Sequence, residues 1–388
     1  MDELFVSFIN IAGIPLKSGM LQKEYIALSL ATYMLLLFDI NIRWKRVRFV
    51  SLTMFLVITL FYLTSFFYPG IIDERRGLYI SSLLYYGSGC VSSVVVGAHL
   101  ACVLDKNALN KIEKLLPLFV IPIGVVVGTL GLQKAMTSYG EGGLTISDYQ
   151  ATSYIMSEVF AYCIYCLFFR EKGKGNTFLL SLILAVLVLY SPIACVASGG
   201  RGGFVLCIIY LFFFIALFVK TGLINRSKLL SYVAIFSILL LSIAYIIDLE
   251  EIGGFVRIVN TLSKDDARSE LYKGAIKLYE SAPLFGHGIG SIWFNQGIYS
   301  HNIVLDLLAE IGLFGTIVVF IFLIRILIAL IKLSYRRPEF SMILIVFTKG
   351  LVLALFSGYW LNIPQLWLGF GFVCTLGVKG IKVECSKK

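Results

Sequence analysis

Long apolar stretches, separated by short polar ones, run along almost the whole chain. A helix needs about 20 mainly apolar residues to cross the hydrocarbon core of a bilayer. Stretches of that kind lie at residues 23–40, 47–68, 78–104, 112–133, 150–169, 177–197, 203–219, 229–247, 303–333, 340–358 and 364–380. They predict an all-α integral membrane protein, a polytopic bundle of about eleven transmembrane helices within a range of about ten to twelve. The run from Leu4 to Leu16 is either an interfacial helix or a twelfth span.

The composition agrees with this interpretation. Hydrophobic residues make up 59% of the 388 residues, charged residues make up 14%, and the mean hydropathy is +0.89. These values are typical of proteins whose solvent is lipid and exclude an ordinary soluble domain. We therefore expect one polytopic membrane domain over residues 1–388 in contact with membrane lipids. We find no internal repeat.

The net charge of +10 is explained by membrane topology. Lysine and arginine cluster in every second connection, as in Arg43–Arg48 and Lys332–Arg337. This alternation follows the positive-inside rule, so we expect the C-terminus in the cytoplasm and no nucleic-acid partner. The rule assigns residues 134–149, 198–202, 248–302 and 359–363 to the outer face.

The segment 248–302 is long for a connection and is predicted to be a large ordered loop at the outer face. Within it, residues Ala267–Glu280 have the pattern of a helix with one apolar face and charged residues on the face opposite to it. That apolar face consists of Leu271, Ala275, Leu278 and Tyr279. The pattern predicts an amphipathic helix that lies on the membrane surface or over the mouth of a cavity.

Arg201 stands among glycines in Ser198-Gly-Gly-Arg-Gly-Gly203, on the outer side, where the positive-inside rule disfavours arginine. The helix that follows would present its N-terminus, with unpaired N–H groups and the positive end of its dipole, to that side. We expect Gly200 and Gly202 to leave room for a ligand. A guanidinium at such a helix end is suited to phosphate oxygens, and contact with a lipid headgroup is the alternative.

Two further polar candidates lie at predicted helix starts on the outer face. Arg268 opens the amphipathic helix, and His301 with Asn302 precedes the next long span. If these residues converge with Arg201, they form a polyanion site beside a group that moves a proton near neutral pH. The alternatives are that Arg268 pairs with a neighbouring carboxylate and that His301 caps a helix. His287 is a competing base candidate.

We expect no metal and no cofactor at this site. The acidic residues of the outer face have no spacing that requires a metal; they are Asp265, Asp266, Asp306 and Glu310. Glu158 and Lys349 fall in the middle of predicted spans. There they have a structural role, line a water-filled cavity, or pair with one another or with another group inside the bundle.

Four segments together resemble the O-antigen ligase and polymerase superfamily of bacterial membrane glycosyltransferases. They are Ser198-Gly-Gly-Arg-Gly-Gly203, Ala267-Arg-Ser269, Ser281-Ala-Pro-Leu-Phe-Gly-His-Gly-Ile-Gly290, and Ser300-His-Asn302 followed by Leu305 to Gly315. The resemblance is specific over about residues 190–320. It implies a fold like the GT-C class and a polyprenyl (undecaprenyl) diphosphate-linked glycan as donor. It places the reaction at the periplasmic side of the bacterial inner membrane, within polysaccharide or lipopolysaccharide synthesis.

The resemblance also implies residue roles. Arg201 and Arg268 would bind the diphosphate and stabilise it as leaving group, and His301 would act on the acceptor hydroxyl. A single displacement would invert the anomeric centre, without a metal. Further substrate contacts are expected at Gly200, Gly202, Asn302 and Tyr299. Tyr299, Trp293 and Trp360 are candidates for stacking on sugars, with an interfacial aromatic belt as the alternative.

The function predicted first is a polymerase that transfers a growing lipid-linked glycan to the next lipid-linked repeat unit. The alternative within the family is a ligase that transfers the glycan to lipid A core or another acceptor. A lipid-linked oligosaccharide flippase is the alternative from another class, and the absence of a repeat disfavours it. A chain-length regulator and a flippase of the same pathway are the expected protein partners.

Overall fold

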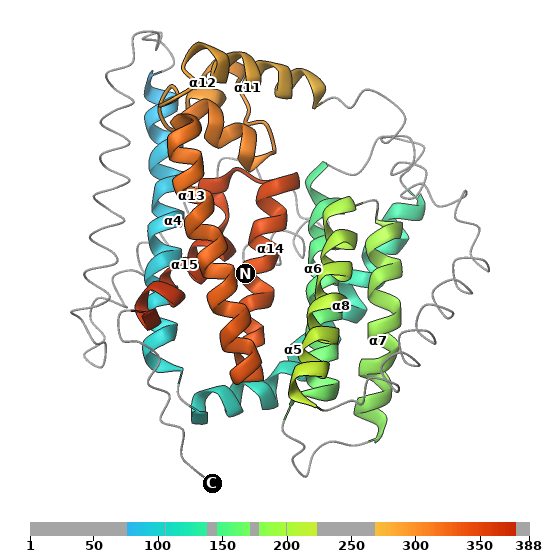
Figure 1. Ribbon diagram of the computed structural model, residues 1–388. Helices are drawn as coiled ribbons and strands as arrows, with labels where there is room; N and C mark the ends of the chain where they lie inside the picture. The colour runs from blue at the N-terminus through green and yellow to red at the C-terminus, as the bar shows by residue number, and fades with distance from the viewer. Residues whose placement is uncertain are drawn as a thin grey trace. The chain divides into compact units, whose positions relative to one another are not determined.

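The computed structural model describes residues 76–104, 106–137, 146–170, 178–198, 200–222 and 268–377, and every regular element in them is helical (Figure 1). The α-helices are α4 (Arg76–Val103), α5 (Lys106–Thr137), α6 (Ile146–Phe168), α7 (Phe178–Ala197), α8 (Arg201–Thr221), α11 (Ser269–Ser281), α12 (Ser291–Gln296), α13 (Ile303–Arg336), α14 (Ser341–Phe356) and α15 (Pro364–Gly377). Two short 3-10 helices are η2 (Pro338–Phe340) and η3 (Trp360–Asn362). The all-helical class predicted from the sequence is confirmed for these residues.

Six helical stretches within the described residues are long and apolar enough to cross a membrane. They are Ala108–Thr129, Gln150–Phe168, Phe178–Ala197, Arg201–Thr221, Ile303–Arg336 and Pro338–Phe356. Shorter apolar helices at Gly89–Val103 and Pro364–Leu376 coincide with two more predicted spans. The predicted spans at 23–40, 47–68 and 229–247, and the run from Leu4 to Leu16, lie outside the described residues. The chain is a multi-pass membrane protein, and the count of about eleven spans stays a prediction.

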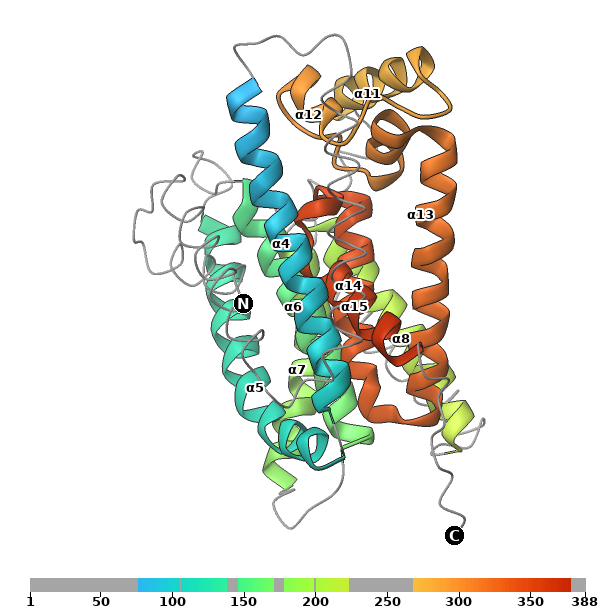
Figure 2. The same cartoon turned by 90° about the vertical axis from the view of Figure 1, so that its left-hand side faces the viewer.

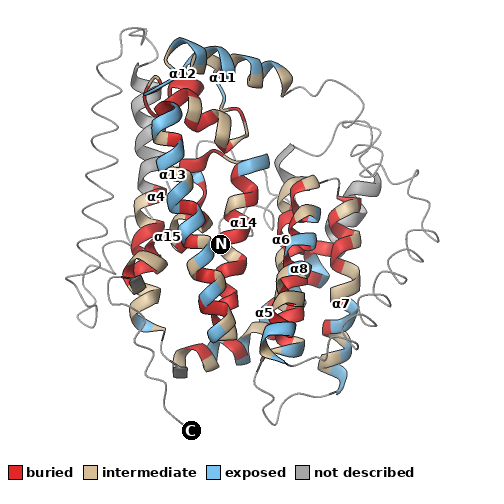
Figure 3. Cartoon of the chain, viewed as in Figure 1, coloured by how far each residue is buried: buried red, intermediate tan, exposed pale blue. Residues whose placement is uncertain are grey.

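Exposed and buried positions alternate along these helices (Figure 3). Many of the exposed positions are large apolar residues. Phe178 is 84% exposed, and Leu118 and Phe212 are 67% and 66% exposed. In water such a surface would be unfavourable, whereas lipid tails solvate it. The burial pattern therefore agrees with lipid as the solvent of these helices.

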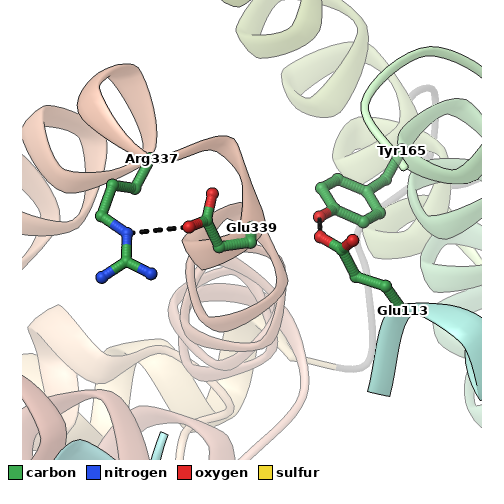
Figure 4. Close-up of polar contacts among 4 residues, drawn as sticks. All are labelled: Glu113, Tyr165, Arg337 and Glu339. Carbon is green, nitrogen blue, oxygen red and sulfur yellow. Dashed lines mark hydrogen bonds and ion pairs between the residues drawn. The ribbon is translucent and has the colours of Figure 1, made fainter. Parts of the chain in front are cut away.

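The chain divides into two compact units, and each one combines segments that are distant in the sequence. The first unit includes residues 106–265 and 331–345, and the second includes residues 266–330 and 346–388 together with α4. In the first unit, α6 packs against α5, α7 and α8. Figure 4 shows two polar contacts of this unit, the hydrogen bond from the Tyr165 hydroxyl to Glu113 and the 2.8 Å ion pair between Arg337 and Glu339.

In the second unit, α15 lies along α4 (Figure 2). Glycines allow the two backbones to come very close. A Cβ atom on Gly97 of α4 would lie 2.0 Å from the Leu368 carbonyl oxygen, and a Cβ atom on Gly371 of α15 would lie 2.0 Å from the Val94 carbonyl oxygen. Small residues at such contacts are typical of helix packing in membranes, where van der Waals contact replaces the hydrophobic effect.

The long helix α13 is broken at Gly312, whose backbone has φ 66° and ψ −175°. The sequence predicted one continuous span here, because apolar residues continue on both sides of the break. A continuous helix would pair the N–H groups of Leu313 and Phe314 with the carbonyls of Ala309 and Glu310. The break leaves these four backbone groups in need of other partners.

The glycine-rich turn between α11 and α12 supplies all four partners. Leu313 and Phe314 donate to the carbonyls of Pro283 and Leu284, at N···O distances of 2.8 Å and 3.3 Å. The N–H groups of His287 and Gly288 in turn donate to the carbonyls of Ala309 and Glu310, at 3.0 Å and 2.7 Å. The turn is therefore inserted into the broken helix, and it fixes where α11 and α12 lie relative to the start of α13 (Figures 1 and 2).

We predict that Gly312→Ala destabilises the protein far more than Gly297→Ala. Both glycines have a positive φ, but a Cβ atom on Gly297 would meet nothing within 4 Å, whereas one on Gly312 would lie 2.4 Å from the Leu284 backbone. The positive φ alone costs an alanine about 1 kcal/mol. Displacing the turn should bring the loss for Gly312→Ala to about 3 kcal/mol or more. Melting temperatures of the detergent-solubilised variants measure the two losses of stability. Equal decreases for the two variants would contradict the close packing of the glycine-rich turn into the broken helix α13.

Candidate functional site

Arg268 and His301 both bind the C-terminal end of α14. The Nη1 atom of Arg268 donates to the Phe356 carbonyl oxygen at 2.6 Å, and the Nδ1 atom of His301 lies 2.7 Å from the Ser357 carbonyl oxygen. The last carbonyls of a helix have no partner within the helix and carry the negative end of its dipole. The structure thus brings two of the three predicted catalytic residues to adjacent carbonyls of one helix end.

The contact with Ser357 determines which nitrogen of His301 carries the proton. A carbonyl oxygen only accepts hydrogen bonds, so the Nδ1 atom of a neutral ring must be the donor. The Nε2 atom then keeps its lone pair and is able to accept a proton. His301 also has φ 62° and is the one non-glycine residue with positive φ among the residues that the structure describes. Such backbone strain is often found at functional sites.

The surroundings of His301 favour the neutral ring. Burial lowers the pKa of His301 below its ordinary value of 6.5, and the positive charge of Arg268 lowers the pKa further. The hydrogen bond to the Ser357 carbonyl acts in the opposite direction and raises the pKa, but the net shift is downward. At neutral pH the side chain is therefore suited to act as a general base.

Tyr299, one of the predicted substrate contacts, lies beside the His301 ring. The two ring centroids are 4.4 Å apart, and the Tyr299 ring is 5.5 Å from that of Tyr359. On its other side Tyr299 packs against the apolar cluster of Ala275, Ile292 and Ala309. This aromatic packing restricts the histidine ring between Tyr299 and the end of α14.

Asn302, another predicted substrate contact, caps α13. Its Oδ1 atom accepts hydrogen bonds from the backbone N–H groups of Val304 and Leu305, at 2.9 Å and 3.4 Å. The capping role that the sequence left open for His301 is thus filled by its neighbour. Ser300 is fixed as well, because its N–H and hydroxyl groups donate to Asp306 at 2.9 Å and 2.6 Å. The residues on both sides of His301 are held by the first turn of α13.

Arg201 is the first residue of α8, which begins two residues before the predicted span at 203–219, and it is preceded by Gly200 as the N-cap. The N-cap residue Gly200 has no side chain that could cap this helix start. The N–H groups at a helix start are suited to bind an anion. The Gly200 carbonyl accepts a 2.6 Å hydrogen bond from the Ser153 hydroxyl, which fixes the approach to the helix. Arg201 belongs to the first unit, whereas Arg268 and His301 belong to the second. The convergence of all three residues stays a prediction.

The glycines after Arg201 lie in close contact with α6, which the sequence did not predict. A Cβ atom on Gly202 would lie 2.0 Å from the Tyr154 hydroxyl oxygen, and one on Gly203 would lie 2.2 Å from the Ser153 hydroxyl oxygen. Both glycines are buried. They are therefore small because α8 packs closely against α6, and the structure gives no support for Gly202 as a substrate contact.

His287, the competing base candidate, holds the glycine-rich turn against the end of α11. Its Nε2 atom lies 2.8 Å from the Ser281 hydroxyl oxygen and 3.0 Å from the Leu278 carbonyl oxygen. These contacts connect the turn to the last residues of α11. The Nε2 atom of His287 is thus bound by the chain itself, whereas the contact found for His301 within the described part of the chain is made by its Nδ1 atom.

Sequence reasoning missed the role of Glu310, which it considered only as a metal ligand. Its carboxylate is fully buried and accepts hydrogen bonds from the Gly290 N–H, the Tyr359 hydroxyl and the Trp360 Nε1 atom, at 2.8, 2.8 and 2.9 Å. A carboxylate inside an apolar span was the available signal. Within the described residues, no group of three or more His, Cys, Asp or Glu side chains is placed to hold a metal ion.

Glu158 and Lys349, the two ionisable residues of predicted span centres, lie in different units. Lys349 is 4% exposed in α14, and Glu158 is half-buried in α6. Their pairing with one another stays untested.

The family comparison agrees with the residues assembled above. Residues 183–320 match the family model described as O-antigen ligase, a range that contains Arg201, Arg268 and His301. Comparison with curated proteins gave no match. The resemblance noted in the sequence over about residues 190–320 is confirmed. The match supports a relation of this region to the O-antigen ligase and polymerase superfamily.

Proposed function

We propose that the protein is a metal-independent, inverting glycosyltransferase that polymerises a surface polysaccharide at the periplasmic side of the bacterial inner membrane. Its donor would be a polyprenyl-diphosphate-linked glycan, and its acceptor a sugar hydroxyl of another lipid-linked repeat unit. The observation that supports the proposal is the pair of contacts at the end of α14, in which Arg268 and the Nδ1 atom of His301 bind adjacent carbonyls. The Nε2 atom of His301 would then be the proton acceptor.

In the proposed reaction, the acceptor hydroxyl oxygen attacks the anomeric carbon of the donor glycan. The bond from that carbon to the phosphate oxygen breaks, and the polyprenyl diphosphate leaves with the electron pair. The proton of the hydroxyl passes to the Nε2 atom of His301. Because the attack comes from the side opposite to the leaving group, the anomeric configuration inverts.

Negative charge grows on the diphosphate as the bond breaks, and this charge must be stabilised. Arg268 provides one guanidinium, and Arg201 would provide the second. The start of α8 supports this role for Arg201, because its N–H groups have no side-chain cap and the positive end of the helix dipole is there. Such groups stabilise a diphosphate without requiring a metal ion.

A ligase is the second candidate, because the family model that matches residues 183–320 is described as O-antigen ligase. A ligase would use the same donor and the same three residues, and it would transfer the glycan to lipid A core or another acceptor. The two functions differ in the acceptor alone.

Deletion of the gene in its host should distinguish the two functions. A polymerase mutant should keep surface glycan limited to a single repeat unit, because ligation still works. A ligase mutant should accumulate complete glycan on the lipid carrier. Gel analysis of surface and lipid-linked glycan measures this, and a normal glycan pattern in the mutant would contradict both functions.

The pH dependence of transfer tests the coupling between Arg268 and His301. In the wild type, kcat/KM should fall only at a pH below 6.5, because the pKa of His301 is lowered and the ring must be neutral to accept a proton. Arg268→Gln removes the charge that lowers the pKa, so the residual activity should fall at a higher pH than in the wild type. His301→Ala should reduce kcat about 100-fold to 10,000-fold at all pH values.

Lys277→Gln is the matched control for that measurement, because it removes the same charge from an exposed position of the same helix. Its pH profile should coincide with that of the wild type, since solvent screens an exposed charge. A profile of Arg268→Gln that is unchanged, or that moves to lower pH, would show that Arg268 does not control the protonation of His301.

A further inference from the structure

We infer that Glu310 is a positioning residue for His301, acting through Tyr359 and the chain segment that carries the Ser357 carbonyl. The inference rests on the proposed function, in which His301 accepts the proton of the acceptor hydroxyl. Glu310 is fully buried in α13, so we assign it no contact with the substrate.

The first step is the way in which Glu310 holds η3. One carboxylate oxygen, Oε1, accepts from the Tyr359 hydroxyl at 2.8 Å, and the other, Oε2, accepts from the Trp360 Nε1 atom at 2.9 Å. Two neighbouring side chains of the segment after α14 are thus bound by one carboxylate. Because no water reaches a fully buried group, loss of the carboxylate would leave both donors unpaired.

The second step leads from η3 to the His301 ring along the backbone. Tyr359 is two residues after Ser357, whose carbonyl oxygen lies 2.7 Å from the His301 Nδ1 atom. At the other end of this short segment, the N–H groups of Ser357 and Gly358 both donate to the Leu353 carbonyl, at 2.8 and 2.7 Å. The Ser357 carbonyl is therefore held between α14 on one side and the side chains bound by Glu310 on the other.

A second path leads to His301 through the aromatic rings. The Tyr299 ring lies between those of Tyr359 and His301, at centroid distances of 5.5 Å and 4.4 Å. If Tyr359 is displaced, both the carbonyl that fixes the Nδ1 proton and the ring that packs against His301 lose their support. The charged group that faces His301 on the other element is Arg268, and it does not depend on the Tyr359 hydroxyl.

The third step explains why a carboxylate is required. Oε1 of Glu310 accepts from the Gly290 N–H at 2.8 Å as well as from Tyr359, so all three partners are donors. A glutamine has nearly the same shape, but its NH₂ group would face a donor wherever it pointed. Glu310→Gln therefore leaves at least one buried donor without a partner.

Tyr359→Phe is the cleaner test, because it removes one hydroxyl group and keeps the ring. We expect kcat to fall by about tenfold or more, since misplacing a catalytic group by a fraction of an ångström slows the reaction, with KM changed less than about twofold. The fall of activity at acid pH should also move to lower pH, because a weaker bond to Ser357 no longer raises the pKa of His301. That direction is opposite to the one expected for Arg268→Gln.

Tyr210→Phe is the matched control. Tyr210 is a fully buried tyrosine of the first unit whose hydroxyl donates to the Ile345 carbonyl at 2.8 Å. The variant loses a buried hydrogen bond of the same length, so it reports the effect of lower stability alone. Its kcat and pH profile should equal those of the wild type.

The His301→Ala background separates this inference from the proposed function. If Glu310 and Tyr359 act through His301, then adding Tyr359→Phe or Glu310→Gln to His301→Ala should cause no further loss of kcat. The inference is overturned if Tyr359→Phe behaves like Tyr210→Phe, or if it lowers kcat equally with and without His301. The proposed function itself fails if His301→Ala transfers glycan as fast as the wild type.

Discussion

The buried carboxylate of Glu310 holds together three segments that are distant in the sequence. It belongs to the start of α13. It binds the N–H of Gly290 at the end of the glycine-rich turn, the hydroxyl of Tyr359 just before η3 and the Nε1 atom of Trp360 in η3. Breaking such a contact would leave buried donors unpaired, at about 1–3 kcal/mol for each one. The break at Gly312 adds four backbone hydrogen bonds between α13 and the same turn. Together these contacts determine where the site residues of the second unit lie.

The proposed chemistry of the site depends on the positions that these contacts give to Arg268 and His301. Arg268 and His301 bind two adjacent carbonyls at the end of α14. Because a carbonyl binds the Nδ1 atom of His301, the Nε2 atom would be the proton acceptor in the proposed reaction. Burial and the neighbouring Arg268 lower the pKa of the ring, which favours its neutral form. The same cation is suited to stabilise the diphosphate of a departing lipid carrier. One guanidinium thus serves both the base and the leaving group of the proposed reaction.

Part of this organisation could be predicted from the sequence. The length of apolar stretches predicted the helices because the bilayer fixes how long a span must be, and the motif residues were placed correctly at the starts of α8, α11 and α13. The break at Gly312 was missed, because apolar composition continues across it and does not report φ. The packing of Gly202 against α6 was not predicted, since the sequence does not distinguish a glycine that leaves room for a ligand from one that leaves room for a neighbouring helix. The contact between His301 and the Ser357 carbonyl could not be predicted, because every residue has the same backbone carbonyl and its use as a partner does not show in the sequence.

Reconstitution of the purified protein with a polyprenyl-diphosphate-linked glycan tests the central claim most directly. The bond formed is examined by NMR, and the released lipid diphosphate is quantified. The account predicts one lipid diphosphate released for each glycan transferred, inversion at the anomeric carbon of the new linkage, and loss of both products with His301→Ala. Retention of the anomeric configuration, or an unchanged yield with His301→Ala, would contradict a single displacement in which His301 is the base.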